Sequence, residues 1–278
     1  MTPLVFAAVL FGALLHASWN AIVKGGSDKL LTTVLVAAAS ALIAIVLLPF
    51  LPQPARASWP FLLTSAVVQV LYFTLVAAAY RATDMSRAYP LMRGLAPALV
   101  ALFAAAVLGE RLGALAWAGV ALICGGVFAM TFAASGAASR KGTLIAVANA
   151  AVIATYTLID GIGVRASGAA AAYAMWLFLL NAIPLVAWAL AARPAAFRAY
   201  AARNWRLGLV GGVGNLGSYG LALWAMTRAP VAVVAALRET SILFGLAIAA
   251  LLLGERVGPA RLLAAALIVA GAIGLRLA

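Results

Sequence analysis

The amino-acid sequence predicts an all-α integral membrane protein with ten transmembrane helices, arranged as two inverted five-helix repeats. The composition is 67% hydrophobic and only 9% charged, whereas soluble domains are about 45–50% apolar and about 25% charged. The apolar runs also reach the roughly 20 residues that a helix needs to cross a bilayer. Finally, the charged tripeptide Gly-Glu-Arg occurs twice, at residues 109–111 and 254–256. In a chain with so few charges, this duplication indicates an internal repeat.

Charges, prolines and glycines interrupt the apolar runs and mark the expected helix ends. Every backbone amide in hydrocarbon needs an internal partner, so the runs are expected to be helices. The predicted helices span residues 3–23, 31–51, 59–80, 85–108, 112–132, 142–163, 170–191, 205–226, 229–253 and 259–277. The longest predicted loops are LPQPARASW, AASGAASRK and ARPAAFRAYAARN, after the second, fifth and seventh helices. None of them is long enough to hold a soluble catalytic or nucleotide-binding domain. The first run lacks a preceding basic segment and is read as a retained span.

Comparing the chain with itself tests the repeat. At an offset of 145 positions the matches include Arg93 with Arg238, Leu108–Arg111 with Leu253–Arg256, and Gly126 with Gly271. At an offset of 140, His16 falls on Tyr156 and Asn20 on Asp160. These matches predict repeats at residues 1–135 and 141–278. An odd number of spans in each repeat inverts the second in the bilayer, and inverted repeats are typical of secondary transporters.

The Glu-Arg pair closes the fourth helix of each predicted repeat. We interpret it as a turn salt bridge and helix cap rather than a catalytic pair, because exposed ion pairs are weak. Two five-helix halves that each carry Leu-Gly-Glu at this point resemble the EamA family of the drug/metabolite transporter superfamily. The resemblance covers the whole chain and implies transport of small metabolites. It also implies a central cavity walled mainly by the first, third, fourth, sixth, eighth and ninth helices, with the fifth and tenth outside it.

Two arginines are predicted to lie deep in the membrane. Arg93 is about eight residues into its helix, roughly 12 Å from the end at 1.5 Å per residue. Arg238 lies at a similar depth, measured from the opposite face, so both are expected near the midplane. Converging guanidinium groups suit a carboxylate, phosphonate or phosphate, which arginine binds through two hydrogen bonds. The alternative is that Glu239 or Asp160 pairs with them inside the protein.

Polar side chains also form stripes on otherwise apolar helices. His16 and Asn20 share a face of the first helix, and Asn149, Tyr156 and Asp160 share a face of the sixth. Such stripes face a cavity or another helix rather than lipid, and hydrogen bonding between helices is the alternative role for the asparagines. Imidazole titrates near neutral pH, and burial can raise the pKa of a carboxyl group. His16, Asp160 and Glu239 are therefore candidates for proton coupling. The predicted substrate-binding residues are Arg93, Arg238, His16, Asn20, Tyr156, Asp160, Glu239, Trp19, Tyr72, Asn149, Asn215 and Tyr219.

The run GLVGGVGNLGSYG in the eighth helix contains GxGxxG, the spacing of a dinucleotide-binding motif. We reject that reading because the motif needs a strand, a turn and a helix start, whereas these glycines lie within one apolar span. The spacing of Gly208 and Gly212 instead predicts close helix packing.

The predicted function is a secondary transporter, an exporter or permease, that moves a small polar metabolite by alternating access. An amino acid or another organic anion is favoured as solute; the alternatives are a multidrug or cationic-solute exporter, a non-transporting membrane subunit, and a lipid-modifying enzyme. No cofactor, metal site or enzymatic activity is predicted. The net charge of +13 is spread as membrane-flanking residues rather than a nucleic-acid-binding face. The expected setting is a bacterial plasma membrane, as monomer or homodimer, with both termini outside.

Overall fold

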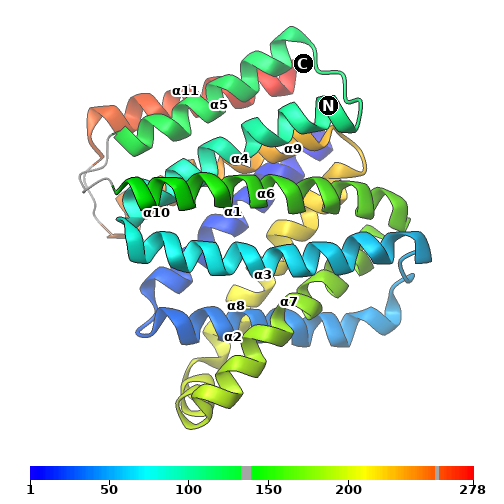
Figure 1. Ribbon diagram of the computed structural model, residues 1–278, viewed down its shortest axis with the longest axis vertical. Helices are drawn as coiled ribbons and strands as arrows, with labels where there is room; N and C mark the ends of the chain where they lie inside the picture. Colours follow the sequence, from blue (N-terminus) through cyan, green and yellow to red (C-terminus); the bar gives the residue numbers. More distant parts are fainter. Residues whose placement is uncertain (133–138, 254–256) are drawn as a thin grey trace.

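The computed structural model describes residues 1–132, 139–253 and 257–278, and these residues fold into helices joined by turns (Figure 1). The long helices are α1 (Pro3–Gly25), α2 (Lys29–Leu47), α3 (Trp59–Ala82), α4 (Met85–Val107), α5 (Ala114–Phe132), α6 (Arg140–Ser167), α7 (Ala170–Ala192), α8 (Pro194–Met226), α9 (Val231–Arg238), α10 (Ser241–Leu253) and α11 (Pro259–Leu277). Two short 3₁₀ helices, η1 (Leu48–Phe50) and η2 (Arg56–Ser58), lie in the connection between α2 and α3.

The chain is an integral, multi-pass membrane protein. Within the described residues, eight helical segments are long and apolar enough to cross a bilayer, and α9 and α10 together supply one of them (Val231–Leu251). The other two predicted spans correspond to α5, whose apolar part is shorter (Ala114–Met130), and to α8. Glycines and polar residues dilute the apolar character of the second half of α8.

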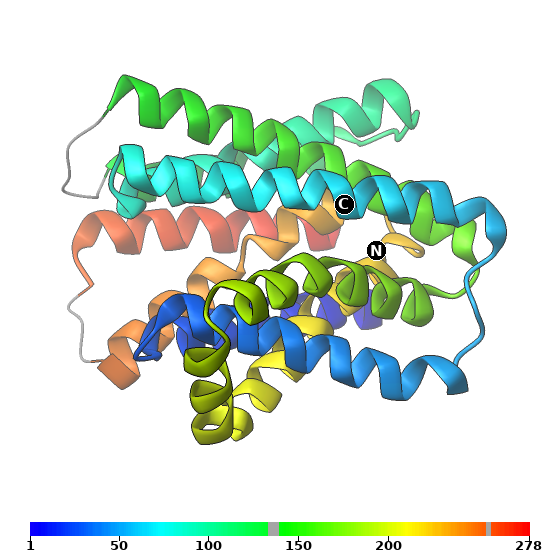
Figure 2. The ribbon, with the colours of Figure 1, turned by 60° about the horizontal axis from the view of Figure 1, so that its bottom comes forward.

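The helices run back and forth between two ends of the molecule (Figures 1 and 2). Both termini and the α2–α3 connection lie toward the right of Figure 1, and we call this side the terminus end. The α1–α2 and α3–α4 turns lie on the left, at what we call the opposite end. Because the chain alternates between ends, the α4–α5 and α8–α9 turns also belong to the terminus end.

The predicted loop ARPAAFRAYAARN is wrong, since its residues from Pro194 onward form the first turns of α8. Proline suits the first turn of a helix, which has no use for its missing amide hydrogen. Alanine and arginine, which dominate the following residues, are strong helix formers. Phe197 is buried in a small apolar cluster with Leu31 and Leu35 of α2. The sequence prediction assigned the segment to a loop because of its charges and proline.

The predicted continuous helix 229–253 is also wrong. It breaks between α9 and α10 at Glu239 and Thr240. Here the amides of Glu239 and Thr240 donate to the carbonyls three residues earlier, Ala236 and Leu237, each at 3.0 Å. This tighter 3₁₀-type turn inside a long apolar segment is typical of a hinge or functional site. By contrast, α4 is continuous although it contains Pro90 and Pro97.

The glycines of α8 allow close contact with α2, as predicted from their spacing. A Cβ atom added to Gly208 would lie 2.6 Å from Leu35 Cγ, and one added to Gly212 would lie 2.8 Å from Ala39 Cβ. Neither position has room for a side chain, so the glycine run serves helix packing.

Helices α5 and α11 pack against each other through contacts that occur in matching pairs. A Cβ atom on Gly126 would lie 2.7 Å from Ile268 Cγ1, and one on Gly271 would lie 2.7 Å from Ile123 Cγ1. Positions 126 and 271, like 123 and 268, are 145 residues apart. The two halves of the chain therefore meet at this interface through residues at matching positions.

Replacing Gly126 by valine is expected to destabilise the protein by about 1–3 kcal/mol, since the added methyl groups would overlap Ile268 and the Ala264 carbonyl. Thermal unfolding in detergent measures the effect. Gly125→Val is the matched control, because nothing lies within 4 Å of a Cβ atom there. Equal destabilisation by both variants would show that helix propensity, and not the interface, sets the cost.

Candidate functional site

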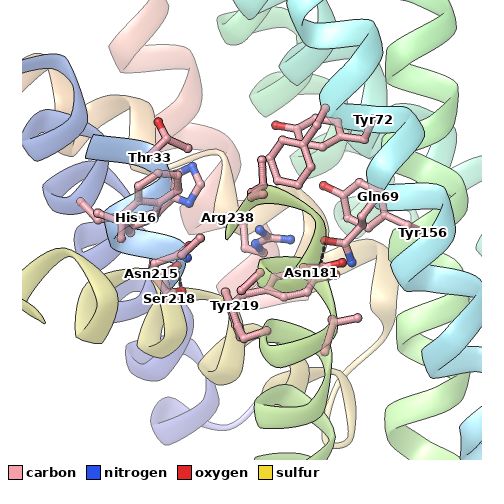
Figure 3. A pocket seen from close by; sticks show the side chains of 18 of the residues that line it. His16, Thr33, Gln69, Tyr72, Tyr156, Asn181, Asn215, Ser218, Tyr219 and Arg238 are labelled. Atoms are coloured by element: carbon pink, nitrogen blue, oxygen red, sulfur yellow. Dashed lines mark hydrogen bonds between the residues drawn. The ribbon is translucent and has the colours of Figure 1, made fainter. Parts of the chain in front are cut away.

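A cavity of about 140 Å³ lies among the helices (Figure 3). It is lined by residues of α1, α2, α3, α4, α6, α7, α8 and α9. All six helices expected to wall the cavity contribute to it; α2 and α7 also contribute, which the sequence analysis did not predict. None of the lining residues belongs to α5 or α11. The polar and charged lining side chains are His16, Thr33, Gln69, Arg93, Asn181, Asn215, Ser218 and Arg238.

Arg238 is the last residue of α9 and projects into the cavity (Figure 3). Its guanidinium carbon lies 4.6 Å from the centre of the Tyr219 ring, a cation–π contact. Within the described part of the chain, no carboxylate forms an ion pair with Arg238. The aromatic face holds the charge in place and leaves its hydrogen-bond donors available to a solute.

Arg93 lines the same cavity but has an internal partner. Its Nε atom lies 2.8 Å from Glu239 Oε2, and the two side chains are 12% and 6% exposed. The contact counts as an ion pair but not as a hydrogen bond. Among the described residues, Nε and Nη2 of Arg93 both lack a hydrogen-bond partner. The two interpretations therefore apply to different arginines. Internal pairing describes Arg93, while Arg238 lies in the cavity without a carboxylate partner.

The break after α9 explains why Glu239 reaches Arg93. A continuous helix would advance each residue by a fixed 100° turn, whereas the 3₁₀-type turn at Glu239 and Thr240 changes the direction of the chain. Arg238 and Glu239 are consecutive, yet Arg238 lines the cavity and Glu239 is buried beside Arg93 of α4.

Asp160 lies behind the cavity wall and is fully buried. The Tyr219 hydroxyl donates to its Oδ2 at 2.6 Å, and the Tyr173 hydroxyl to its Oδ1 at 3.2 Å. Neither arginine pairs with it. Tyr219 thus has two partners, with its ring against Arg238 and its hydroxyl on Asp160.

Among the other predicted site residues, six line the cavity: His16, Trp19, Tyr72, Tyr156, Asn215 and Tyr219. His16 and Trp19 contact edge to face at 5.3 Å between ring centres, and Tyr72 and Tyr156 at 5.7 Å. Besides Asp160 and Glu239, two more predicted residues are absent from the lining. Asn20 donates to the His16 carbonyl at 2.7 Å, within its own helix, and Asn149 donates to Met92 Sδ at 2.9 Å. For Asn149 this is the alternative interhelical role.

The predicted set omits the polar residues that α3 and α7 share. The Asn181 side-chain amide donates to Gln69 Oε1 at 2.8 Å, and both residues line the cavity (Figure 3). Ser218 also lines it and is absent from the prediction. A signal for Asn181 was present, because a lone amide inside the apolar run LLNAIPLV favours a buried polar contact. Within the described residues, no group of three His, Cys, Asp or Glu side chains could hold a metal ion.

The first Gly-Glu-Arg turn ties the two halves of the chain together at the terminus end. Glu110 Oε1 accepts from the backbone amide of Val231 at 2.8 Å, and Oε2 from that of Ala232 at 3.3 Å. Glu110 also pairs with Arg165 at 2.9 Å. Arg165 in turn donates to the carbonyls of Met226 and Ala229, at 2.8 and 3.0 Å. Together, Glu110 and Arg165 form what we call the α9 clamp.

The sequence analysis placed the partners of this turn wrongly. Glu110 does cap a helix and does form a salt bridge, but the helix is α9 of the second half and the cation is Arg165 of α6. The sequence could not show this because the partners are 55 and 121 residues away. The matching residues 254–256 lie outside the described part of the chain.

Glu110→Ala is expected to destabilise the protein by about 1.5–3 kcal/mol, because it removes hydrogen bonds to a charged group from the start of α9. Thermal unfolding of the purified protein in detergent measures this. Arg111→Ala, at the exposed neighbouring position, should leave the unfolding temperature unchanged. A similar loss in both variants would mean that the turn, and not the clamp, determines stability.

The comparisons with known proteins agree with this architecture. The sequence model of the EamA-like transporter family matches residues 4–132 and again residues 140–277. A solved structure described only as the crystal structure of a protein is similar over 100% of this chain and 98% of its own, with a TM-score of 0.80 and 20% sequence identity. That identity shows a shared fold and nothing more specific. No curated protein matches the chain. Because the two family matches together cover nearly all of it, the chain belongs to the EamA-like transporter family.

Proposed function

We propose that this protein is a secondary transporter that moves a small organic anion, an amino acid or another organic acid, through the cavity by alternating access. The observation that carries the proposal is Arg238. It is a permanently charged side chain inside an apolar bundle, held against Tyr219 without a carboxylate partner in the described residues. Unpaired charges within membrane spans are costly and serve function. A carboxylate or phosphate is the group that would offset this cost best.

The buried acids favour an anion over a cation as solute. Asp160 accepts hydrogen bonds from two tyrosines, and Glu239 pairs with Arg93. Neither residue lines the cavity. A cationic solute would therefore meet two arginines and no available carboxylate among the lining side chains.

The proposal includes ten spans in two inverted repeats, residues 1–135 and 141–278. The matching contacts of Gly126 with Ile268 and of Gly271 with Ile123 support it, because a two-fold axis makes every contact occur twice. Two separate matches to one family model, at 4–132 and 140–277, are a second line of support. In this arrangement, α5 and the second half of α8 complete the count of ten.

Alternating access requires the cavity to open toward one end at a time. The lining residues of α1 and α2 are His16, Trp19, Thr33, Val36 and Ala37. All of them lie in the helix halves nearer the opposite end, where α1 ends and α2 begins. At the terminus end, the hydrogen bonds of Tyr219 and Tyr173 to Asp160 join α6 to α8 and α7. The α9 clamp joins the α4–α5 turn to α6 and α9. This asymmetry supports a state that is closed at the terminus end.

Coupling to protons is part of the proposal, through His16, Asp160 or Glu239. The proposal places the protein in a bacterial plasma membrane with both termini outside. The excess of lysine and arginine at the opposite end supports that orientation. A C-terminal reporter fusion tests the orientation.

Counterflow in proteoliposomes tests the function directly. Purified protein should exchange labelled organic acids when the vesicles are preloaded with the same acid, and protein-free vesicles should not. Exchange of cationic solutes in preference to anions would replace the anion proposal by a cation exporter. If no solute in a broad panel exchanges and a lipid product forms, the protein is an enzyme instead.

A further inference from the structure

A chain of hydrogen bonds runs from the buried Ser65 to the cavity. The Gln69 amide donates from Nε2 to Ser65 Oγ at 3.1 Å, and the Asn181 amide donates from Nδ2 to Gln69 Oε1 at 2.8 Å. The chain crosses from α3 to α7 and ends at Asn181, which lines the cavity.

The direction of these bonds decides which polar group of Asn181 stays without a partner. The Gln69 NH₂ group is used on Ser65 Oγ, so the Gln69 oxygen accepts from Asn181. Asn181 uses its NH₂ group on Gln69, which leaves its own carbonyl oxygen, Oδ1, for other contacts.

That oxygen has no hydrogen-bond partner among the described residues, although it is shielded from solvent. A buried unsatisfied carbonyl costs about 1–3 kcal/mol, and such a group calls for an explanation. Three other buried polar atoms of cavity-lining residues also lack a hydrogen-bond partner: Arg93 Nε, Arg93 Nη2 and Trp19 Nε1. All three are donors. The cavity therefore offers unpaired donors on α1 and α4, the Arg238 guanidinium, and an unpaired acceptor on α7.

We propose that Asn181 is a specificity-determining residue, and that the transported anion also carries a hydrogen-bond donor, an ammonium or a hydroxyl group, which binds to Asn181 Oδ1. The anionic group binds to Arg238, and the donor faces the α7 side (Figure 3). The solute class is thus an amino acid or a hydroxy acid rather than a simple carboxylate. The inference rests on the proposed anion transport and adds the second recognition group.

Binding of three matched carboxylates to the purified protein tests the inference: propionate, which has no donor, lactate, which adds a hydroxyl, and alanine, which adds an ammonium group. Scintillation proximity binding with each labelled compound gives the affinities. We expect wild-type protein to bind lactate or alanine about two- to tenfold more tightly than propionate, the ratio that corresponds to one hydrogen bond. Asn181→Leu removes the acceptor at similar volume and should erase that preference.

Gln69→Leu tests the hydrogen-bond chain without touching Asn181. It frees the Asn181 amide to rotate, so the preference for donor-bearing anions should fall here too. Asn204→Leu is the matched control, because the Asn204 side chain donates to the Tyr200 carbonyl in the first turns of α8, outside the cavity. It should preserve the wild-type preference.

The outcomes separate the inference from the proposed function. If no anion binds, or if Arg238→Gln leaves anion binding intact, the anion site itself is rejected. If binding depends on Arg238 but wild type binds all three anions equally, or if the preference survives in Asn181→Leu, then the anion site stands and the role of Asn181 is rejected.

Discussion

Replacing Arg238 by glutamine is expected to reduce transport of the anionic solute by at least about 100-fold. The reason is the loss of charge-assisted hydrogen bonds to the anion, each worth about 1.5–3 kcal/mol. Glutamine keeps a polar side chain of moderate length but carries no charge, so the cation–π contact with Tyr219 is lost together with the anion site. The measurement is the initial rate of counterflow in proteoliposomes, normalised to the amount of inserted protein.

Arg228→Gln is the matched control for this prediction. Arg228 also lies over an aromatic ring, 5.7 Å from the centre of Trp224, but it belongs to the α8–α9 turn and does not line the cavity. Its loss should leave the rate within about twofold of wild type, since exposed cation–π contacts are worth about 0.5–1 kcal/mol. Equal rates for wild type and the Arg238 variant would remove Arg238 from the solute pathway.

Arg238→Lys separates charge from geometry. Lysine keeps the positive charge but presents a single ammonium group instead of a planar fork with two parallel donors. If the solute is bound through two hydrogen bonds, the lysine variant should transport at a rate between those of wild type and the glutamine variant. Full activity in the lysine variant would indicate that the site requires only a positive charge.

The parts of the fold that depend on long periodic features were predictable from the sequence. Apolar runs located the helices, and the offset of 145 residues located Arg93, Arg238 and the glycines of α5 and α11 before any coordinates. These features repeat, so chance explains them poorly. The resulting expectation that both arginines share one cavity agrees with the structure.

The parts that depend on long-range contacts were not predictable. Nothing around Glu239 marks a helix break, because Leu, Arg, Glu and Thr are all compatible with a helix. The break becomes clear only when Arg93, on another helix, is seen to pair with Glu239. The partner of Glu110 lies 121 residues away in sequence and is a backbone amide, which no side-chain pattern reveals. Asn181 was overlooked for a different reason, since one amide in an apolar run carries little weight without its partner Gln69.

Replacing Arg93 by alanine would not by itself identify a solute contact, even if transport were lost. Arg93 and Glu239 form a buried pair, and removing one partner of such a pair leaves an uncompensated charge, at a cost of about 3–5 kcal/mol. A simple loss of function would therefore mix a folding defect with a binding defect. A double replacement resolves the two effects.

We expect Arg93→Met alone and Glu239→Gln alone each to lower the free energy of unfolding by about 3–5 kcal/mol, because each leaves one buried charge without its partner. The double variant Arg93→Met/Glu239→Gln contains neither charge and should recover most of that loss. Thermal unfolding in detergent of wild type, the two single variants and the double variant measures this coupling.

If the double variant is as unstable as the sum of the singles, the two side chains act independently and the pair is not coupled. If it is stable yet transports slowly, the pair contributes to transport beyond its structural role, through the unpaired Nη2 donor of Arg93 or through proton coupling at Glu239. Stable and fully active protein would instead leave Arg238 as the one arginine that the solute requires.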